Sequence, residues 1–243
     1  MASARRELRS DTRLAAMSSF LLGHITEAQK HADIVISQFD RARHGHVMIT
    51  YGQDPKTIAE AYVSVYQWVT GWPEKACRAW ERAIEEALEL DHVGTLGPVL
   101  AWGGVHGHAL KRDKEGMRQI HEHLRVLTSH HKMPIWEINE RLAKAMLSSM
   151  DSPSEQSVAE LLDVLTDFEA FTVYPSMLFP LEWGWYLAEN YCAIGAPDLA
   201  LEANEKGLKF AEASKEHWSD SELFRMRGVA LAMRDGVEGR RFI

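Results

Sequence analysis

The 243-residue sequence has little cysteine, no long apolar run and no excess of basic residues. Its two cysteines, Cys77 and Cys192, lie far apart inside helical patterns, which favours two buried free thiols over a disulfide and fits a reducing cytoplasm. No apolar segment reaches the roughly 18–20 residues needed to cross a membrane. The net charge of −8 argues against broad nucleic-acid binding, although a short basic segment with four arginines lies at residues 5–13. We therefore expect a cytoplasmic protein that binds neither membranes nor nucleic acids.

Motifs of catalysis and cofactor binding are absent as well. The sequence has no GxSxG, no CxxC and no Walker-type GxxxxGK[ST], and GGVHGH (103–108) lies within a helical pattern instead of opening a helix after a strand. Glu182 and Glu189 share one predicted helix, and Asp167 and Glu169 are nearby in sequence. No nucleophile or general base is paired with these carboxylates, so we expect them on solvated helix faces. The sequence thus predicts no enzyme activity, no catalytic residue and no cofactor.

What the sequence does contain is a repeated helical hairpin, clearest over residues 54–92. Two amphipathic helices are joined there by Gly71-Trp72-Pro73, where glycine can take the left-handed conformation that ends a helix and proline fits the first turn of the next. A small residue follows the turn glycine at the same interval in three places: Gly23 to Ala28, Gly71 to Ala76 and Gly195 to Ala200 are each five apart. A small side chain there lets the second helix lie close to the first, so this spacing indicates an internal repeat.

No β-alternating run of convincing length occurs, so the pattern predicts an all-α fold. We expect a right-handed, tetratricopeptide-like superhelix of antiparallel helix pairs (an α-solenoid), with a period longer than the ~34 residues of a standard tetratricopeptide repeat. Residues 41–53 are interpreted as a loop or a short turn of helix. The glycine-rich segment 93–111 is expected to be a broken or unusually tightly packed helix. One repeat domain should span 1–243, with helix pairs at about 10–40, 54–92, 93–130, 134–172 and 176–215 and a terminal helix at 218–234.

Four stretches carry a resemblance to a known family: FDRARHGH (39–46), YGQDP (51–55), VTGWPEKA (69–76) and EHWSDSELFRMRG (216–228). They resemble the C-terminal repeats of bacterial multidomain regulators that join a class III adenylate/guanylate cyclase domain, or a winged-helix domain, to a signalling ATPase and a tetratricopeptide-like tail. The cyclase and ATPase portions are missing here. The resemblance implies a sensing or docking region, with catalysis in sequence that is not present.

Twelve histidines raise the question of a metal site. His106 and His108 are two residues apart, as are His121 and His123, and this spacing places the two side chains of a pair on different faces of a helix. Neither pair alone makes a chelate. A site assembled across the hairpin from both pairs stays an alternative, but surface or helix-capping histidines are the preferred interpretation.

Aromatic residues mostly fall on the first helix of each pair, which would line the concave surface of a superhelix. We weigh two roles for them: core filling within the hairpins, or anchors for a peptide or helix of a partner protein. The candidate binding groove consists of Tyr62, Tyr66, Trp102, Trp136, Asn139, Glu182, Trp183, Tyr186 and Arg225.

The terminal helix, 218–234, lacks a partner helix in the sequence. Its apolar stripe (Leu223, Met226, Val229, Ala230) would need a cover, which predicts a homodimer through that end. The function predicted from the sequence is a non-catalytic scaffold for protein–protein interaction, or a regulatory repeat domain of a bacterial signalling or transcriptional regulator. A repeat domain that senses a small molecule in its concave groove is the first alternative, and an all-α metal-dependent enzyme the second.

Overall fold

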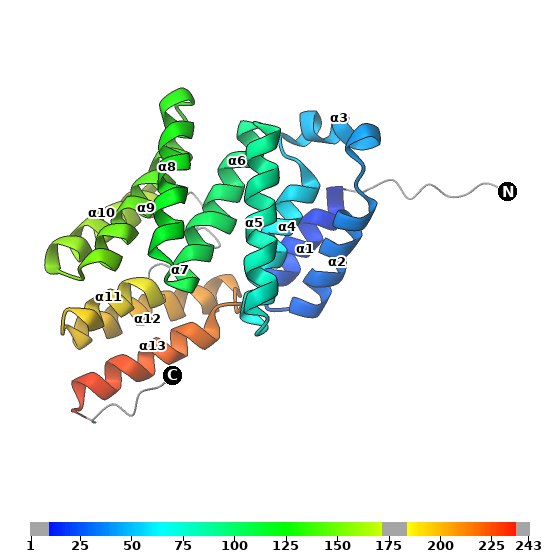
Figure 1. Cartoon of the computed structure of the whole chain (residues 1–243). Coiled ribbons are helices and arrows are strands. Elements are labelled where there is room, and N and C mark those ends of the chain that lie inside the picture. Colours follow the sequence, from blue (N-terminus) through cyan, green and yellow to red (C-terminus); the bar gives the residue numbers. More distant parts are fainter. Residues whose placement is uncertain (1–9, 172–183, 237–243) are drawn as a thin grey trace. The chain divides into compact units, whose positions relative to one another are not determined.

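The structure is a computed structural model that describes residues 10–171 and 184–236. Its helices group into two compact units: residues up to 116 with 129–131, and residues 117–128 with 132 onward. The sequence predicts one domain over 1–243. The first unit (Figure 1) contains α1 (Ser10–Leu21), α2 (Ile25–Gln38), α3 (Arg41–Tyr51), α4 (Pro55–Val69), α5 (Pro73–Leu90), α6 (Val93–Val99), the π-helix η1 (Leu100–His106) and α7 (Gly107–Lys111).

The second unit contains most of α8, whose two ends belong to the first unit. Its helices are α8 (Lys114–His130), α9 (Pro134–Asp151), α10 (Glu155–Phe171), α11 (Leu187–Ala193), α12 (Pro197–Ser214) and α13 (Asp220–Arg234). Neighbours in sequence pack as pairs: α9 with α10, α11 with α12, and α12 with α13. The described residues form no strand, so the all-α prediction is confirmed. No helix among them is both long and apolar enough to span a membrane.

Helices occupy most of the positions at which the sequence predicts them in the described chain. The main difference is the segment 41–53, which we expected to be a loop or a short turn and which forms the eleven-residue helix α3. Asp40 caps it, because the carboxylate accepts a hydrogen bond from the backbone N–H of Ala42 at 3.0 Å. Gly52 ends it in the left-handed conformation, at φ 70°. The first helix of the fifth pair is described only from Gly184 onward.

The repeated glycine turn is confirmed in atomic detail. Gly23, Gly71 and Gly195 have φ values of 79°, 83° and 76°, where an L side chain would be strained. In each turn the glycine N–H donates to the carbonyl three residues back, and the following N–H donates to the carbonyl five residues back, at 2.8–3.0 Å. This is the Schellman arrangement, and it satisfies carbonyls that the end of a helix leaves without partners.

The helix after each turn buries residues in one shared register. Counting from the glycine, the fifth, ninth, twelfth and sixteenth residues are buried in all three cases, the sixteenth after Gly23 being the C-cap residue of α2. The fifth residue is alanine each time and is fully buried, as the sequence predicts. The register continues over Ala28, Ala32, Val35 and Phe39; over Ala76, Trp80, Ala83 and Ala87; and over Ala200, Asn204, Gly207 and Ala211. Each second helix therefore presents the same face to its neighbours.

Close backbone contacts explain several glycines. A Cβ atom on Gly94 would collide with the carbonyl oxygen of Gly52, and one on Gly107 would lie 2.7 Å from the indole of Trp80. In the second unit, Gly184 and Gly207 face each other so closely that neither has room for a Cβ atom. The prediction of a broken or tightly packed helix over 93–111 is confirmed, since α6, η1 and α7 follow one another there with a π-helical middle. Both cysteines are free; Cys192 is buried and Cys77 half-buried.

Candidate functional site

A polar cluster joins α3, α4 and α5 of the first unit. Asp54 is fully buried at the start of α4, where its carboxylate accepts hydrogen bonds from the backbone N–H and the hydroxyl of Thr57, each at 2.9 Å. Arg41 Nε donates to Asp54 Oδ2 at 2.8 Å, and Arg41 Nη2 reaches Glu86 of α5 at 3.1 Å. Lys56 also pairs with Glu86, at 2.7 Å. The cluster therefore ties three helices together.

The cluster fixes the charge state of its carboxylates. Burial acts to raise the pKa of Asp54, but the hydrogen bonds from Arg41 and Thr57 outweigh burial and hold that pKa below its ordinary value. Burial also opposes ionisation of Glu86, and Lys56 and Arg41 overcome it in the same way. Glu60 differs: burial raises its pKa, and its Oε2 atom is buried without a hydrogen bond among the described residues. FDRARHGH and YGQDP supply Arg41 and Asp54, so a structural role explains much of these two motifs.

The π-helix η1 carries the first four residues of GGVHGH, the candidate groove residue Trp102, and His106, which belongs to the alternative metal site. π-Helical turns often occur at functional sites. Trp102 is buried, with its ring 5.8 Å from that of His106. His106 is almost fully buried, and burial lowers its pKa to about 3, which keeps the imidazole neutral. The sequence GGVHGH thus builds packing contacts in the first unit.

The aromatic residues expected in a binding groove of the first unit are core residues. Tyr66 is fully buried; its ring lies 4.4 Å from that of Phe20, and its hydroxyl donates to the carbonyl of Ala16 at 3.2 Å. Tyr62 packs edge-on against Trp102, with ring centroids 5.3 Å apart. A partner protein could not reach these side chains without local opening. Of the two roles weighed for them, core filling is the one that the structure supports.

The remaining groove candidates lie in the second unit or outside the described residues. Tyr186 is buried, with its hydroxyl 3.0 Å from Ser149 Oγ, and Asn139 is buried with its amide donating to the carbonyl of Ile135 at 2.8 Å. Trp136 is half-buried. Arg225 is also half-buried and donates to Glu222 at 2.9 Å. Glu182 and Trp183 lie outside the described residues.

The charged candidates have structural partners where they are described. Asp167 accepts from Arg141 at 2.6 Å, and Glu169 accepts from Lys206 at 2.7 Å, both on exposed surface. His108 pairs with Asp113 at 3.0 Å, and His121 pairs with Glu140 at 2.8 Å. Among the described residues, no group of three or more histidine, cysteine or carboxylate side chains could hold a metal ion.

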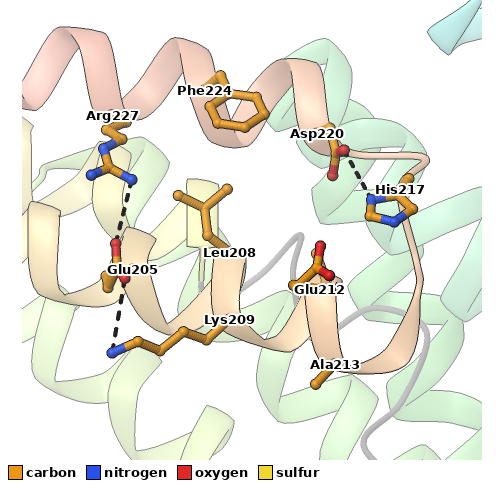
Figure 2. Close-up of a pocket in the computed structure, with 10 residues that line it drawn as sticks. Glu205, Leu208, Lys209, Glu212, Ala213, His217, Asp220, Phe224 and Arg227 are labelled. Atoms are coloured by element: carbon orange, nitrogen blue, oxygen red, sulfur yellow. Dashed lines mark hydrogen bonds and ion pairs between the residues drawn. The ribbon is translucent and has the colours of Figure 1, made fainter.

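An open hollow of about 470 Å³ lies between α12 and α13 (Figure 2). Its apolar centre is formed by Leu208 and Ala211 of α12 and Phe224 of α13. Phe224 is 60% exposed, although a phenylalanine gains a few kcal/mol when it is fully buried. We call this feature the α12–α13 groove. Aromatic residues are enriched in protein interfaces, so an exposed ring beside a hollow is a candidate anchor for a protein partner.

Charged side chains surround this apolar centre. Glu205 on α12 is shared by Arg227 of α13 at 3.4 Å and by Lys209 at 3.8 Å (Figure 2). At the loop end of the groove, Asp220 pairs with His217 at 3.0 Å. All of these groups are substantially exposed, so their pairing contributes little to stability and leaves them available to a ligand.

The α12–α13 groove was missed by the sequence interpretation, and the apolar stripe of α13 was misassigned. Leu223, Met226 and Ala230 are not exposed: they are buried, because this face of α13 packs on α12 and α11. The stripe is already covered within the chain, so it no longer gives a reason to expect a homodimer through this helix. The signal for the groove was Phe224 itself, a large aromatic residue that lies outside the apolar stripe of its own helix.

Comparisons with known proteins do not assign the chain to a family. No protein-family model matches the sequence, and neither the curated proteins nor the solved structures contain a significant match.

Proposed function

We propose that this protein is a non-catalytic interaction domain, built from tetratricopeptide-like helical hairpins in a right-handed superhelix, that docks a partner protein in a bacterial signalling or transcriptional regulator. The repeated turn with its shared buried register is the observation that carries the proposal. Proteins made of such repeats present extended surfaces, and these surfaces commonly bind other proteins. The α12–α13 groove supplies an exposed aromatic side chain with a charged rim.

The chemistry of the groove supports a protein ligand over a reactive substrate. Its charged groups pair with one another at the surface, and none is a buried nucleophile or base of the kind that catalysis needs. An open hollow around one exposed ring suits a side chain of another protein, whereas small-molecule sites are enclosed and bury most of their ligand. Partner docking is therefore the function that this surface fits best.

The test is to identify a direct partner and to measure its binding. The full chain, carrying an affinity tag, is crosslinked in its native cells, and the proteins recovered with it are identified by mass spectrometry. A purified partner should then bind the chain in isothermal titration calorimetry with a defined stoichiometry. The proposal fails if no recovered protein binds directly. A stoichiometric metabolite or metal in native mass spectrometry would instead favour the sensor or the metalloenzyme.

A further inference from the structure

The last described helix, α13, occupies the position in its hairpin series that α4 occupies in the first unit. Helix α4 packs on α2 and α1, and α13 packs in the same way on α12 and α11. Both helices have fifteen residues. They differ in what covers them: α4 is packed by α5, and to a smaller extent by α6 and η1, and buries eleven residues, whereas α13 buries only Leu223, Met226 and Ala230. Among the described helices of the second unit, none packs on the outer face of α13 in the way that α5 packs on α4.

The outer face of α13 has the shape that a covering helix needs. Phe224, Arg227, Gly228 and Leu231 follow one another at helical spacing on this face. A Cβ atom on Gly228 would meet nothing within 4 Å, so the backbone is open to close approach. Leu208 of α12 lies opposite Phe224 (Figure 2). A helix laid along this line would bury the exposed ring of Phe224.

The charges along the α12–α13 groove define the polarity of such a helix. At the loop end, Glu212 pairs with Lys215 and Asp220 with His217, which leaves one net negative charge when histidine is counted as neutral. Farther along, Arg227 and Lys209 share the single carboxylate of Glu205, which leaves one net positive charge. A helix antiparallel to α13, as α5 is to α4, would place its C-terminal end at the negative part. Basic residues in its last turn and acidic residues in its first would complement both the groove and its own helix dipole.

We propose that the α12–α13 groove binds an amphipathic helix of a partner protein, antiparallel to α13, with acidic residues in its first turn and basic residues in its last. This inference rests on the proposed function and adds the site and the chemistry of the partner. The helix inserts an apolar side chain between Leu208 and Phe224, and the exposed ring of Phe224 is its main anchor.

The experiment uses the full chain and a phage-displayed library of 18-residue amphipathic helices, in which the charges of the first and last turns are randomised. Selected peptides are synthesised, and their binding is measured by fluorescence anisotropy. We expect enrichment of acidic first turns and basic last turns. Phe224→Ala should weaken binding at least tenfold, whereas Leu199→Ala, which removes another exposed side chain of α12 outside the groove, should change it less than twofold. A variant with Asp220→Lys and Arg227→Glu should select peptides of the opposite polarity.

Several outcomes would overturn the inference. Peptides that bind the Phe224→Ala variant as well as the original chain would place the site elsewhere, and enrichment without charge polarity would remove the antiparallel assignment. No enrichment at all would show that the groove does not accept a helix. A dimer in sedimentation that Phe224→Ala dissociates would assign the groove to a second copy of the chain. If a cellular partner binds equally well after Phe224→Ala, the inference fails while the proposed function stands; if no partner binds, the proposed function fails.

Discussion

Single buried polar residues hold helices of this protein together by bridging backbones. Asn204 on α12 is the clearest case in the second unit. Its side-chain amide donates to the carbonyl of Gly184 at 2.8 Å and to the carbonyl of Leu223 on α13 at 2.9 Å. It stands at the position of the hairpin register that Trp80 occupies in the first unit. One side chain therefore connects three segments of backbone.

Replacing Asn204 should destabilise the protein strongly. Asn204→Leu keeps the branching of the side chain, adds some bulk and leaves two buried carbonyls without these donors, so we expect a loss of about 2–4 kcal/mol in the free energy of unfolding. Asn204→Asp should cost more, because it points a carboxylate at two carbonyl oxygens. Urea unfolding followed by circular dichroism measures both. A loss below about 1 kcal/mol for both variants would show that the bridge is unimportant.

Glu216, in the loop between α12 and α13, gives a prediction about pH. The residue is 9% exposed, its Oε2 atom has no hydrogen bond among the described residues, and burial raises its pKa to about 7. Between about pH 4.5 and pH 7 the folded protein keeps this proton, whereas the unfolded chain has already lost it. Unfolding then releases a proton, so the contribution of Glu216 to stability falls as the pH rises through this range and is constant above it.

The variant Glu216→Gln should remove this dependence and raise the free energy of unfolding at pH 8 by about 1–3 kcal/mol. Thermal unfolding between pH 4.5 and pH 8 provides the comparison. Glu212→Gln, which changes an exposed glutamate nearby, is the control and should leave the decline in place. An unchanged pH profile in Glu216→Gln would mean that this carboxyl ionises normally in the folded protein.

At the scale of the helix, glycine is required by close packing at one position and faces open space at another. Gly107 lies against the buried indole of Trp80, whereas Gly228 on the outer face of α13 has open space around it. The sequence alone shows the same residue type inside two helical patterns. Whether a larger residue would fit depends on how closely a neighbouring helix packs at that position, and the sequence does not show this.

Gly107→Ala should therefore destabilise the protein by about 1–3 kcal/mol, because the added methyl group displaces a packed tryptophan. Gly228→Ala should stabilise it by about 0.5–1 kcal/mol, since alanine is the better helix former and meets no obstacle there. Chemical unfolding of both variants under one set of conditions tests the pair. Equal effects of the same sign would contradict the packing described for Gly107.

The hairpins could be predicted from the sequence because their signals are local. Gly71, Pro73 and Ala76 lie within six residues, and their conformations follow from elementary backbone sterics. Helix α3 was missed because Arg41–Tyr51 has no clear apolar stripe and depends on the Asp40 cap and on Arg41 reaching Asp54. The role of Tyr66 could not be predicted either, since helical spacing shows which residues share a face but not which neighbour covers it.

For the whole molecule, the division into two compact units predicts which amide groups become less protected when one residue is replaced. Gly107→Ala lies in the first unit, and Asn204→Leu lies in the second. If each unit opens as its own cooperative element, each substitution should speed amide hydrogen exchange mainly within its own unit. Exchange followed by mass spectrometry resolves this by peptide. Faster exchange across the entire chain in both variants would show that the two units unfold as one.

The glycine turns also affect the order in which the chain can fold. Every hydrogen bond that closes these turns joins residues at most five apart, and each hairpin packs helices that are adjacent in sequence. Such a fold has low contact order and needs few large loop closures before its first favourable contacts form. A hairpin can therefore collapse as it leaves the ribosome, before later repeats have been synthesised, and the nascent chain shields its apolar faces step by step.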